Sequence, residues 1–124
     1  MVLLLAVMVL PPFSVADEAC DVETGATAYK KCAVCHAFEA GAPHGAGPNL
    51  YGVVDRAVGK ISGFGFSKAL RESSATWSAA HLDAFIENPQ GVYRRNRMAF
   101  SGIRDAATRA ALICYLQSSG GNGR

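Results

Sequence analysis

The strongest chemical signal in the sequence is a group of three side chains near its start. Cys32, Cys35 and His36 form a C-x-x-C-H motif, the pattern used for covalent attachment of a c-type haem. At the C-terminal end of a helix, positions i, i+3 and i+4 lie on one side. Both thiols can therefore form thioethers with the two vinyl groups of a porphyrin while the imidazole reaches the iron. We predict one covalently bound haem c with His36 as an iron ligand.

Two other kinds of site use part of the same motif. A thioredoxin-like redox pair also has the C-x-x-C spacing, but it expects a preceding β-strand and a parallel sheet, for which the sequence shows no pattern. A zinc site needs two further ligands at a matching spacing. Both stay open here as alternatives to haem attachment.

A second axial ligand of the iron would have to come from a distant loop, and Met98 is the candidate. Met1 and Met8 lie in the apolar run at the N-terminus, so Met98 is the only thioether in the rest of the chain. A lone methionine usually fills a gap in a core, but Met98 lies in an irregular stretch. A thioether favours ferrous iron, and two protein ligands leave no open position for oxygen or peroxide. The pair His36 and Met98 predicts an electron carrier rather than an enzyme.

The N-terminus has the pattern of an export signal. Residues 1–10 form an unbroken apolar run, followed by two prolines and by small residues up to Ala16. We predict a signal peptide over residues 1–16, cleaved after Ala16, and a single domain over residues 17–124 in the periplasm. The run is about half of the ~20 residues that a membrane-crossing helix needs, so we expect no stable membrane insertion after cleavage. No Lys or Arg precedes Lys30, and a membrane anchor stays the alternative.

Composition and periodicity favour one small all-α domain. Charged residues make up 18% of the chain and the formal net charge is +2, which argues against a nucleic-acid-binding arm or a disordered acidic tail. Several segments have the 3.6-residue period of amphipathic helices, and strand-like alternation is absent beyond a few residues. Helices are predicted at residues 22–34, 67–73, 78–87 and 105–118, with a further short one starting at Pro48 or Asn49, and long loops at 37–48 and 90–103.

Six sequence features, the C-x-x-C-H motif among them, occur in an order and at spacings that resemble one family. They are CAVCH, GPNLYGVV, GFSKALRES, W-x4-L-x3-IENP, RMAFSGI and ALICYLQ, within residues 21–118. In these features the chain resembles the class I cytochromes c, specifically the bacterial relatives of mitochondrial cytochrome c. The resemblance implies an all-α fold of about five helices wrapped around one haem c. It also implies a soluble carrier that shuttles single electrons between respiratory or photosynthetic redox partners.

The resemblance assigns roles in the cofactor site. It implies that His36 is the proximal iron ligand and Met98 the distal one. It implies that the carbonyl of Pro48 accepts the ring N–H of His36, a bond that orients the imidazole and raises its basicity. Arg56 and Trp77 match positions that hydrogen-bond the inner haem propionate.

The resemblance also bears on the two ends of the domain. Tyr29 and Tyr115 match aromatic contacts where the first and last helices cross. The same topology brings Cys20 near Cys114, and an exported chain with an even pair of remaining cysteines favours a disulfide. The alternative is two unrelated residues, with Cys114 a small buried hydrophobe.

The chain departs from the family pattern at three places. Phe66 stands where a tyrosine usually hydrogen-bonds a propionate, and Phe85 stands where a tyrosine usually donates to the methionine sulfur. Arg94 and Arg95 replace a Pro-Gly pair, and Asn96 replaces a threonine. These replacements leave open how rigid the segment before Met98 is, with a weaker iron–sulfur bond as one outcome.

Positive charge gathers beside the predicted distal ligand. Arg94, Arg95 and Arg97 would lie at the haem edge that the family exposes, where they would attract acidic redox partner proteins through transient, salt-dependent contacts. We expect a monomer that binds no nucleic acid. Three lysines are candidates to widen this positive surface: Lys30, Lys31 and Lys68.

Two other functions are compatible with parts of the sequence. A haem-c peroxidase or small-gas-binding protein with a labile sixth ligand is the alternative function, and the altered segment before Met98 is its only support. A thiol–disulfide oxidoreductase would use Cys32 and Cys35 without haem. His44 and His81 are expected to be solvated surface residues.

Overall fold

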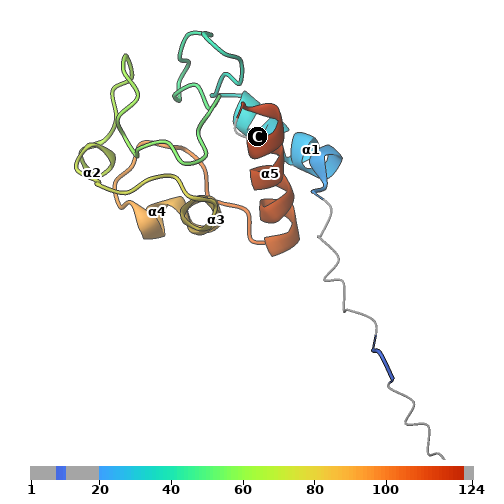
Figure 1. Cartoon of the computed structure of the whole chain (residues 1–124). Coiled ribbons are helices and arrows are strands. Elements are labelled where there is room, and N and C mark those ends of the chain that lie inside the picture. The colour runs from blue at the N-terminus through green and yellow to red at the C-terminus, as the bar shows by residue number, and fades with distance from the viewer. Residues whose placement is uncertain (1–7, 11–19, 122–124) are drawn as a thin grey trace, which may run out of the picture.

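The helices enclose a space lined by side chains from segments far apart in the sequence. The structure is a computed structural model that describes residues 8–10 and 20–121 (Figure 1). In these residues it has five α-helices and no strand; the only β-type pairing among them is an isolated bridge between Ala57 and Thr76. The predicted all-α class is therefore confirmed. The predicted cleavage after Ala16 lies outside the described residues, and within them no helix is long and apolar enough to span a membrane.

Helix α1 (Val22–Ala33) begins directly after its N-cap residue, Asp21. The side chain of Asp21 accepts a 2.9 Å hydrogen bond from the backbone N–H of Thr24, and the Thr24 hydroxyl donates a second one to the same carboxylate. These bonds lower the pKa of Asp21, because they stabilise the ionised carboxylate. A negative group here also complements the positive end of the helix dipole. The cap fixes where α1 starts, and thus where its last turn places the two cysteines of the C-x-x-C-H motif.

Helix α5 (Ala106–Ser119) crosses α1, so the two ends of the domain lie side by side (Figure 1). The crossing is close because Gly25 has no side chain: a Cβ there would overlap the carbonyl oxygen of Ala111. The rings of Tyr29 and Tyr115 lie 5.5 Å apart at this crossing, as the resemblance implied. Phe38 packs against both rings, at 4.9 and 5.3 Å.

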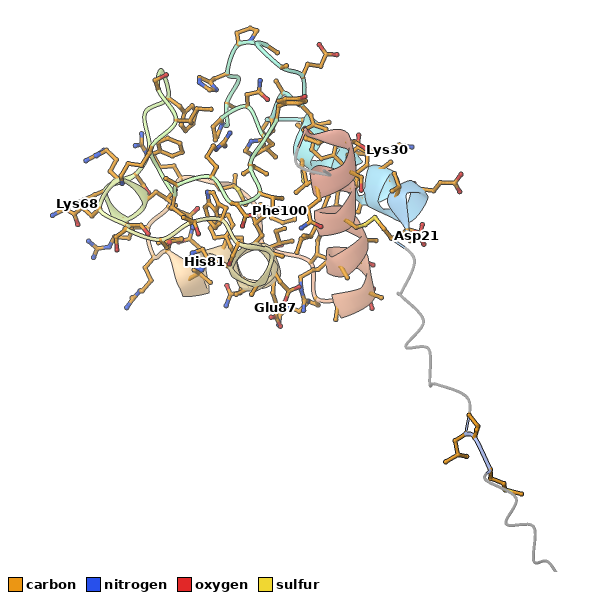
Figure 2. The ribbon with its side chains drawn as sticks, in the orientation of Figure 1. Asp21, Lys30, Lys68, His81, Glu87 and Phe100 are labelled. Carbon is orange, nitrogen blue, oxygen red and sulfur yellow. A yellow bond between two sulfur atoms is a disulfide. The ribbon has the colours of Figure 1, made fainter. Side chains whose placement is uncertain are left out.

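A disulfide joins Cys20 to Cys114 beside this crossing, with the two Cα atoms 5.7 Å apart. Its sulfur atoms are drawn as a yellow bond near Asp21 in Figure 2. Of the two alternatives left open by the sequence, the structure has the bridge. It links Cys20, which lies two residues before α1, to Cys114 within α5.

Three short helices complete the fold on the other side of the molecule. They are α2 (Lys68–Arg71), α3 (Ala79–Glu87) and α4 (Pro89–Val92). The side chain of Ser78 caps α3 by accepting a hydrogen bond from the His81 N–H, as expected for a serine at the N-cap position.

Arg109 fixes α5 to α3. Its guanidinium donates to the carboxylate of Asp83 at 2.8 Å and lies 3.8 Å from that of Glu87, while its side chain is only 7% exposed. It also donates to the carbonyl oxygens of Ile103 and Arg104. The hydrogen bond to Asp83, with support from the neighbouring carboxylates, raises the pKa of Arg109. All of these bonds keep the start of α5 in register with α3.

Two expectations about helices were wrong. No helix starts at Pro48 or Asn49, because the Asn49 side chain takes the local partners instead: its amide donates to two carbonyls, and its oxygen accepts the N–H of Tyr51. Conversely, α4 lies in the stretch predicted to be irregular. The side chain of Asn88 accepts a hydrogen bond from the Gly91 N–H, and Pro89 suits the first position of a new helix.

Removal of the disulfide should lower the stability of the folded protein. The bridge closes a loop with a sequence separation of 94 residues, for which loop-closure entropy predicts about 4 kcal/mol, and less when thioethers already restrict the unfolded chain. We expect the Cys20→Ser/Cys114→Ser double variant to lose about 2–4 kcal/mol of unfolding free energy in guanidinium titrations. A reductant should destabilise the wild type and leave the double variant unchanged. Equal stability of the two proteins under non-reducing conditions would contradict the bridge.

Candidate cofactor site

A cavity of about 510 Å³ lies between α3, α5 and the long loops. Its volume is in the range of cofactor sites, and its walls are mainly apolar. Leu82 and Phe85 contribute from α3, and Leu112 from α5. The structure brings together in this lining all seven side chains that the sequence nominated: Cys32, Cys35, His36, Pro48, Arg56, Trp77 and Met98.

The two motif cysteines reach the cavity from the end of α1. The backbone N–H groups of Cys35 and His36 both donate to the Cys32 carbonyl, at 3.0 and 2.9 Å, so the motif forms one tight turn that continues the helix. Neither thiol is in a disulfide in the structure. Burial raises the pKa of Cys32 to about 11. Redox-active C-x-x-C pairs need the opposite shift, so this environment argues against a thiol–disulfide oxidoreductase.

The structure lends the zinc alternative no support either. Among the described residues, no group of three or more His, Cys, Asp or Glu side chains is placed so that it could hold a metal ion. A structural zinc site needs four such ligands.

The ring of His36 is held on the cavity wall from behind. Its Nδ1 lies 2.7 Å from the Pro48 carbonyl oxygen, so Nδ1–H donates this bond and Nε2 is the nitrogen left for a metal. Burial lowers the pKa of His36, more than the bond to Pro48 raises it. The neutral imidazole, which is the form that ligates iron, is therefore favoured. A Cβ on Gly47 would collide with the ring, so this glycine makes room for it.

Arg56, Trp77 and Ser67 bring polar groups to the mainly apolar lining. The half-buried guanidinium of Arg56 donates to the Asn49 carbonyl at 3.0 Å, and burial lowers its pKa. Trp77 is buried, with its ring 4.8 Å from that of Phe85. Ser67 has the one buried side-chain polar atom in the described residues that lacks a hydrogen-bond partner. Ser67 is also one of the residues that line the cavity.

Ser67 is a site residue that the sequence reasoning missed. It precedes α2 at the N-cap position, which suggests a capping role, yet its side chain makes no capping bond. A buried hydroxyl without a partner costs free energy unless a ligand supplies the bond. The signal in the sequence was its position directly after Phe66, the residue that lacks the hydroxyl of the family's tyrosine.

These features fit a haem c. The cavity offers two thiols and an imidazole from one turn, a thioether-bearing loop, apolar walls for a porphyrin, and an arginine and an unpartnered hydroxyl for its acidic groups. Met98 is half-buried and enters from the segment that follows α4.

The two remaining histidines are not solvated in the way that we expected. His44 is partly buried: its Nδ1 accepts a bond from the Asn49 N–H, and its Nε2 donates to the Ser62 carbonyl, each at 2.9 Å. It thus joins two loops beside the cavity. His81 on α3 is also partly buried, with Nε2 2.8 Å from the Tyr93 hydroxyl (Figure 2). No pattern in the sequence predicts that His44 bonds to the Ser62 carbonyl or that His81 bonds to Tyr93.

The three arginines near Met98, namely Arg94, Arg95 and Arg97, are exposed, and Arg97 also contributes to the cavity lining. Lys30 and Lys68, two of the lysines expected to widen this surface, lie far apart in the view of Figure 2.

The fold and the site define a small all-α protein built around a covalently bound haem. The family model "Cytochrome c" matches residues 22–120, and the chain belongs to this family. It therefore binds haem c with its iron, and it is an electron-transfer protein rather than an enzyme.

Individual relatives agree with this assignment. A "Cytochrome c homolog" of Bradyrhizobium diazoefficiens is 46% identical over 102 residues, which are 82% of this chain and 55% of that relative. This chain thus spans about half the length of that protein. "Cytochrome c2" of Rhodoplanes tepidamans is 38% identical over 104 residues, which are 84% of this chain and 97% of the relative. Among solved structures, cytochrome cH from Methylobacterium extorquens has a TM-score of 0.74 at 35% identity, covering 79% of this chain and 98% of that one.

A methyl group at position 47 should disturb the site. Because a Cβ there meets the His36 ring, Gly47→Ala should cost about 1–3 kcal/mol of unfolding free energy, the usual range for overpacking. Gly65→Ala is the matched control, since a Cβ at Gly65, another residue of the lining, meets nothing within 4 Å. The check is chemical unfolding of both haem-loaded variants. Equal stabilities would mean that the ring is not confined by Gly47.

Proposed function

We propose that this chain is an exported haem-c electron carrier whose iron is held by His36 and Met98. What carries the proposal is the convergence on one cavity of two thiols, an imidazole and a thioether from segments more than 60 residues apart. In this arrangement Cys32 and Cys35 bear the thioethers. His36 and Met98, which line the same cavity, would hold the iron.

The residues around the metal have separate tasks. Pro48 accepts the ring N–H of His36, which holds the imidazole plane and increases its electron donation. Met98 donates weakly to ferric iron and so favours the ferrous state. Arg56, Trp77 and Ser67 supply hydrogen-bond donors to the propionates. Bound haem c supplies a one-electron couple between ferric and ferrous iron.

The apolar walls reduce how much water has to reorganise around the haem during electron transfer. Phe85 and Phe66, each 8% exposed, contribute ring carbons to the lining where a tyrosine hydroxyl would bring a polar group. A bound porphyrin would exclude water from this part of the site, so little solvent would have to reorient when the charge of the iron changes. With His36 and Met98 both holding the iron, no position would remain for a substrate or peroxide.

The proposed partners are acidic redox proteins that dock at the exposed guanidinium groups of Arg94, Arg95 and Arg97. Such a surface increases the encounter rate and leaves the complex short-lived, because exposed charges are screened by salt. The carrier acts as a monomer and binds no nucleic acid.

The proposed localisation of the carrier is the periplasm. The disulfide between Cys20 and Cys114 supports this, because structural disulfides persist in oxidising compartments and are rare in the cytosol. The apolar run and the small residues before Ala16 supply the export signal.

Replacement of the distal ligand should open the iron to small ligands. We expect reduced Met98→Leu to bind carbon monoxide readily and reduced wild type not to bind it, as seen in optical titrations. Leu70→Ala, which removes a side chain from another part of the cavity wall, is the control and should behave as the wild type. If the wild type binds carbon monoxide as readily as Met98→Leu, the sixth position is labile and the gas-binding alternative gains the support.

The docking surface can be probed with a small anionic oxidant. Neutralising Arg94, Arg95 and Arg97 together to Gln should slow oxidation of the ferrous protein by ferricyanide roughly tenfold at low ionic strength, because steering by the positive charges is lost. The difference should vanish at 1 M salt, where the Debye length is about 3 Å. Lys30→Gln removes one charge in the last turn of α1 and should change the rate little. An effect per removed charge as large as that of the triple variant would show that only net charge matters.

A further inference from the structure

The segment that leads to Met98 has no regular secondary structure after α4. Arg95 has a φ of 62°, a left-handed conformation that residues other than glycine seldom adopt. Without the proline and glycine that shape the family's segment, something else must hold this conformation.

Asn96 makes three side-chain hydrogen bonds inside this segment. Its amide nitrogen donates to the carbonyl oxygens of Pro89 at 3.0 Å and Tyr93 at 2.8 Å. Its amide oxygen accepts the backbone N–H of Met98 at 2.9 Å. Asn96 is only 7% exposed, so water does not compete well for these bonds. The residue therefore joins α4 directly to the backbone of Met98.

Gln90, on α4, holds the other side of the same segment. Its amide nitrogen donates to the carbonyl of Asn96, and its amide oxygen accepts the N–H of Arg95, each at 2.9 Å. The second of these bonds satisfies the backbone at the residue in the left-handed conformation. We call the two side chains, Asn96 and Gln90, the amide clasp.

The base to which the clasp is fixed is itself well held. Pro89 belongs to the most deeply buried side chains of the described residues. The Tyr93 hydroxyl is hydrogen-bonded to His81 at 2.8 Å and to Ser73 at 2.9 Å, which ties the end of α4 to α3 and to the segment after α2. The backbone of Met98 is thus connected by hydrogen bonds to α4 and, through Tyr93, to α3 and the segment after α2.

We propose that Asn96 and Gln90 are positioning residues: the amide clasp keeps the Met98 backbone where its sulfur stays on the iron. This inference rests on the proposed ligation by Met98 and names what makes that ligation firm. The clasp takes the place of the stiffness that Pro-Gly gives to other family members. It acts through the backbone, and neither of its two residues lines the cavity.

The expected effect follows from a two-state loop. An exogenous ligand such as imidazole binds the oxidised iron only while Met98 is displaced, so its apparent affinity scales with the open fraction. Loss of the Asn96 amide removes three hydrogen bonds that exist only in the closed loop. The net effect of one or more such bonds is about tenfold or greater in the open fraction.

The chain offers a matched control for this substitution. Asn49 is 6% exposed, and its amide nitrogen also donates to two carbonyls, those of Glu39 and Ala42. Its oxygen likewise accepts the N–H of the residue two positions later, Tyr51. Asn49 therefore has the same chemistry, count of bonds and burial as Asn96, but lies in the loop on the His36 side.

The experiment measures the imidazole dissociation constant and the unfolding midpoint of four haem-loaded variants beside the wild type. Asn96→Ala should bind imidazole at least about tenfold more tightly than the wild type. Gln90→Ala should move in the same direction by a smaller factor. Asn96→Ser keeps an acceptor for the Met98 N–H and should recover part of the loss. Asn49→Ala should lose stability to a degree similar to Asn96→Ala, with imidazole affinity within about twofold of the wild type.

Two results would overturn the inference, and they are distinguishable. If the oxidised wild type lacks the near-infrared band of sulfur bound to ferric haem, Met98 is not a ligand and the proposed function fails together with the clasp. If the wild type has that band but Asn96→Ala and Asn49→Ala shift imidazole affinity equally, only the clasp fails. Asn96 would then stabilise the fold without positioning Met98.

Discussion

The structure depends on one constraint: the space between its helices must be filled by a group that is not part of the chain. The cavity measures about 510 Å³. Its walls are mainly apolar, and a group that covers them is favoured because it removes carbon atoms from contact with water. Covalent attachment through the end of α1 places the porphyrin in this space. The tight α1–α5 crossing and the Arg109 bonds then close the shell around it.

The proposed iron ligands come from loops rather than from helix interiors, and this explains why so many side chains in the loops bond to backbone groups. Asn49 and Asn96 use the same set of hydrogen bonds in two different loops. One supports the segment of Pro48, which holds His36, and the other supports Met98. His44 joins the first loop to a third one through both of its ring nitrogens. An electron carrier benefits from such bracing, because small movements of the ligands keep the reorganisation on electron transfer low.

The sequence predicted those parts of the protein that local rules govern. The 3.6-residue period located α1, α3 and α5, and the C-x-x-C-H motif with its distant methionine nominated residues that share one cavity. The resemblance added the pairing of Tyr29 with Tyr115. Hydrogen bonds from side chains to backbone groups decided the rest: the side chain of Asn49 satisfies groups that a helix would have used, and Asn88 both ends α3 and starts α4. The unpartnered hydroxyl of Ser67 could be seen only once the cavity was present.

The most direct test of this account is the optical spectrum of the haem-loaded oxidised protein in the near infrared. The account predicts a c-type haem spectrum with the weak band that reports methionine sulfur on ferric iron. Its absence from a folded, haem-loaded protein would contradict the central claim that Met98 closes the site, and would leave His36 as the only iron ligand that the structure supports.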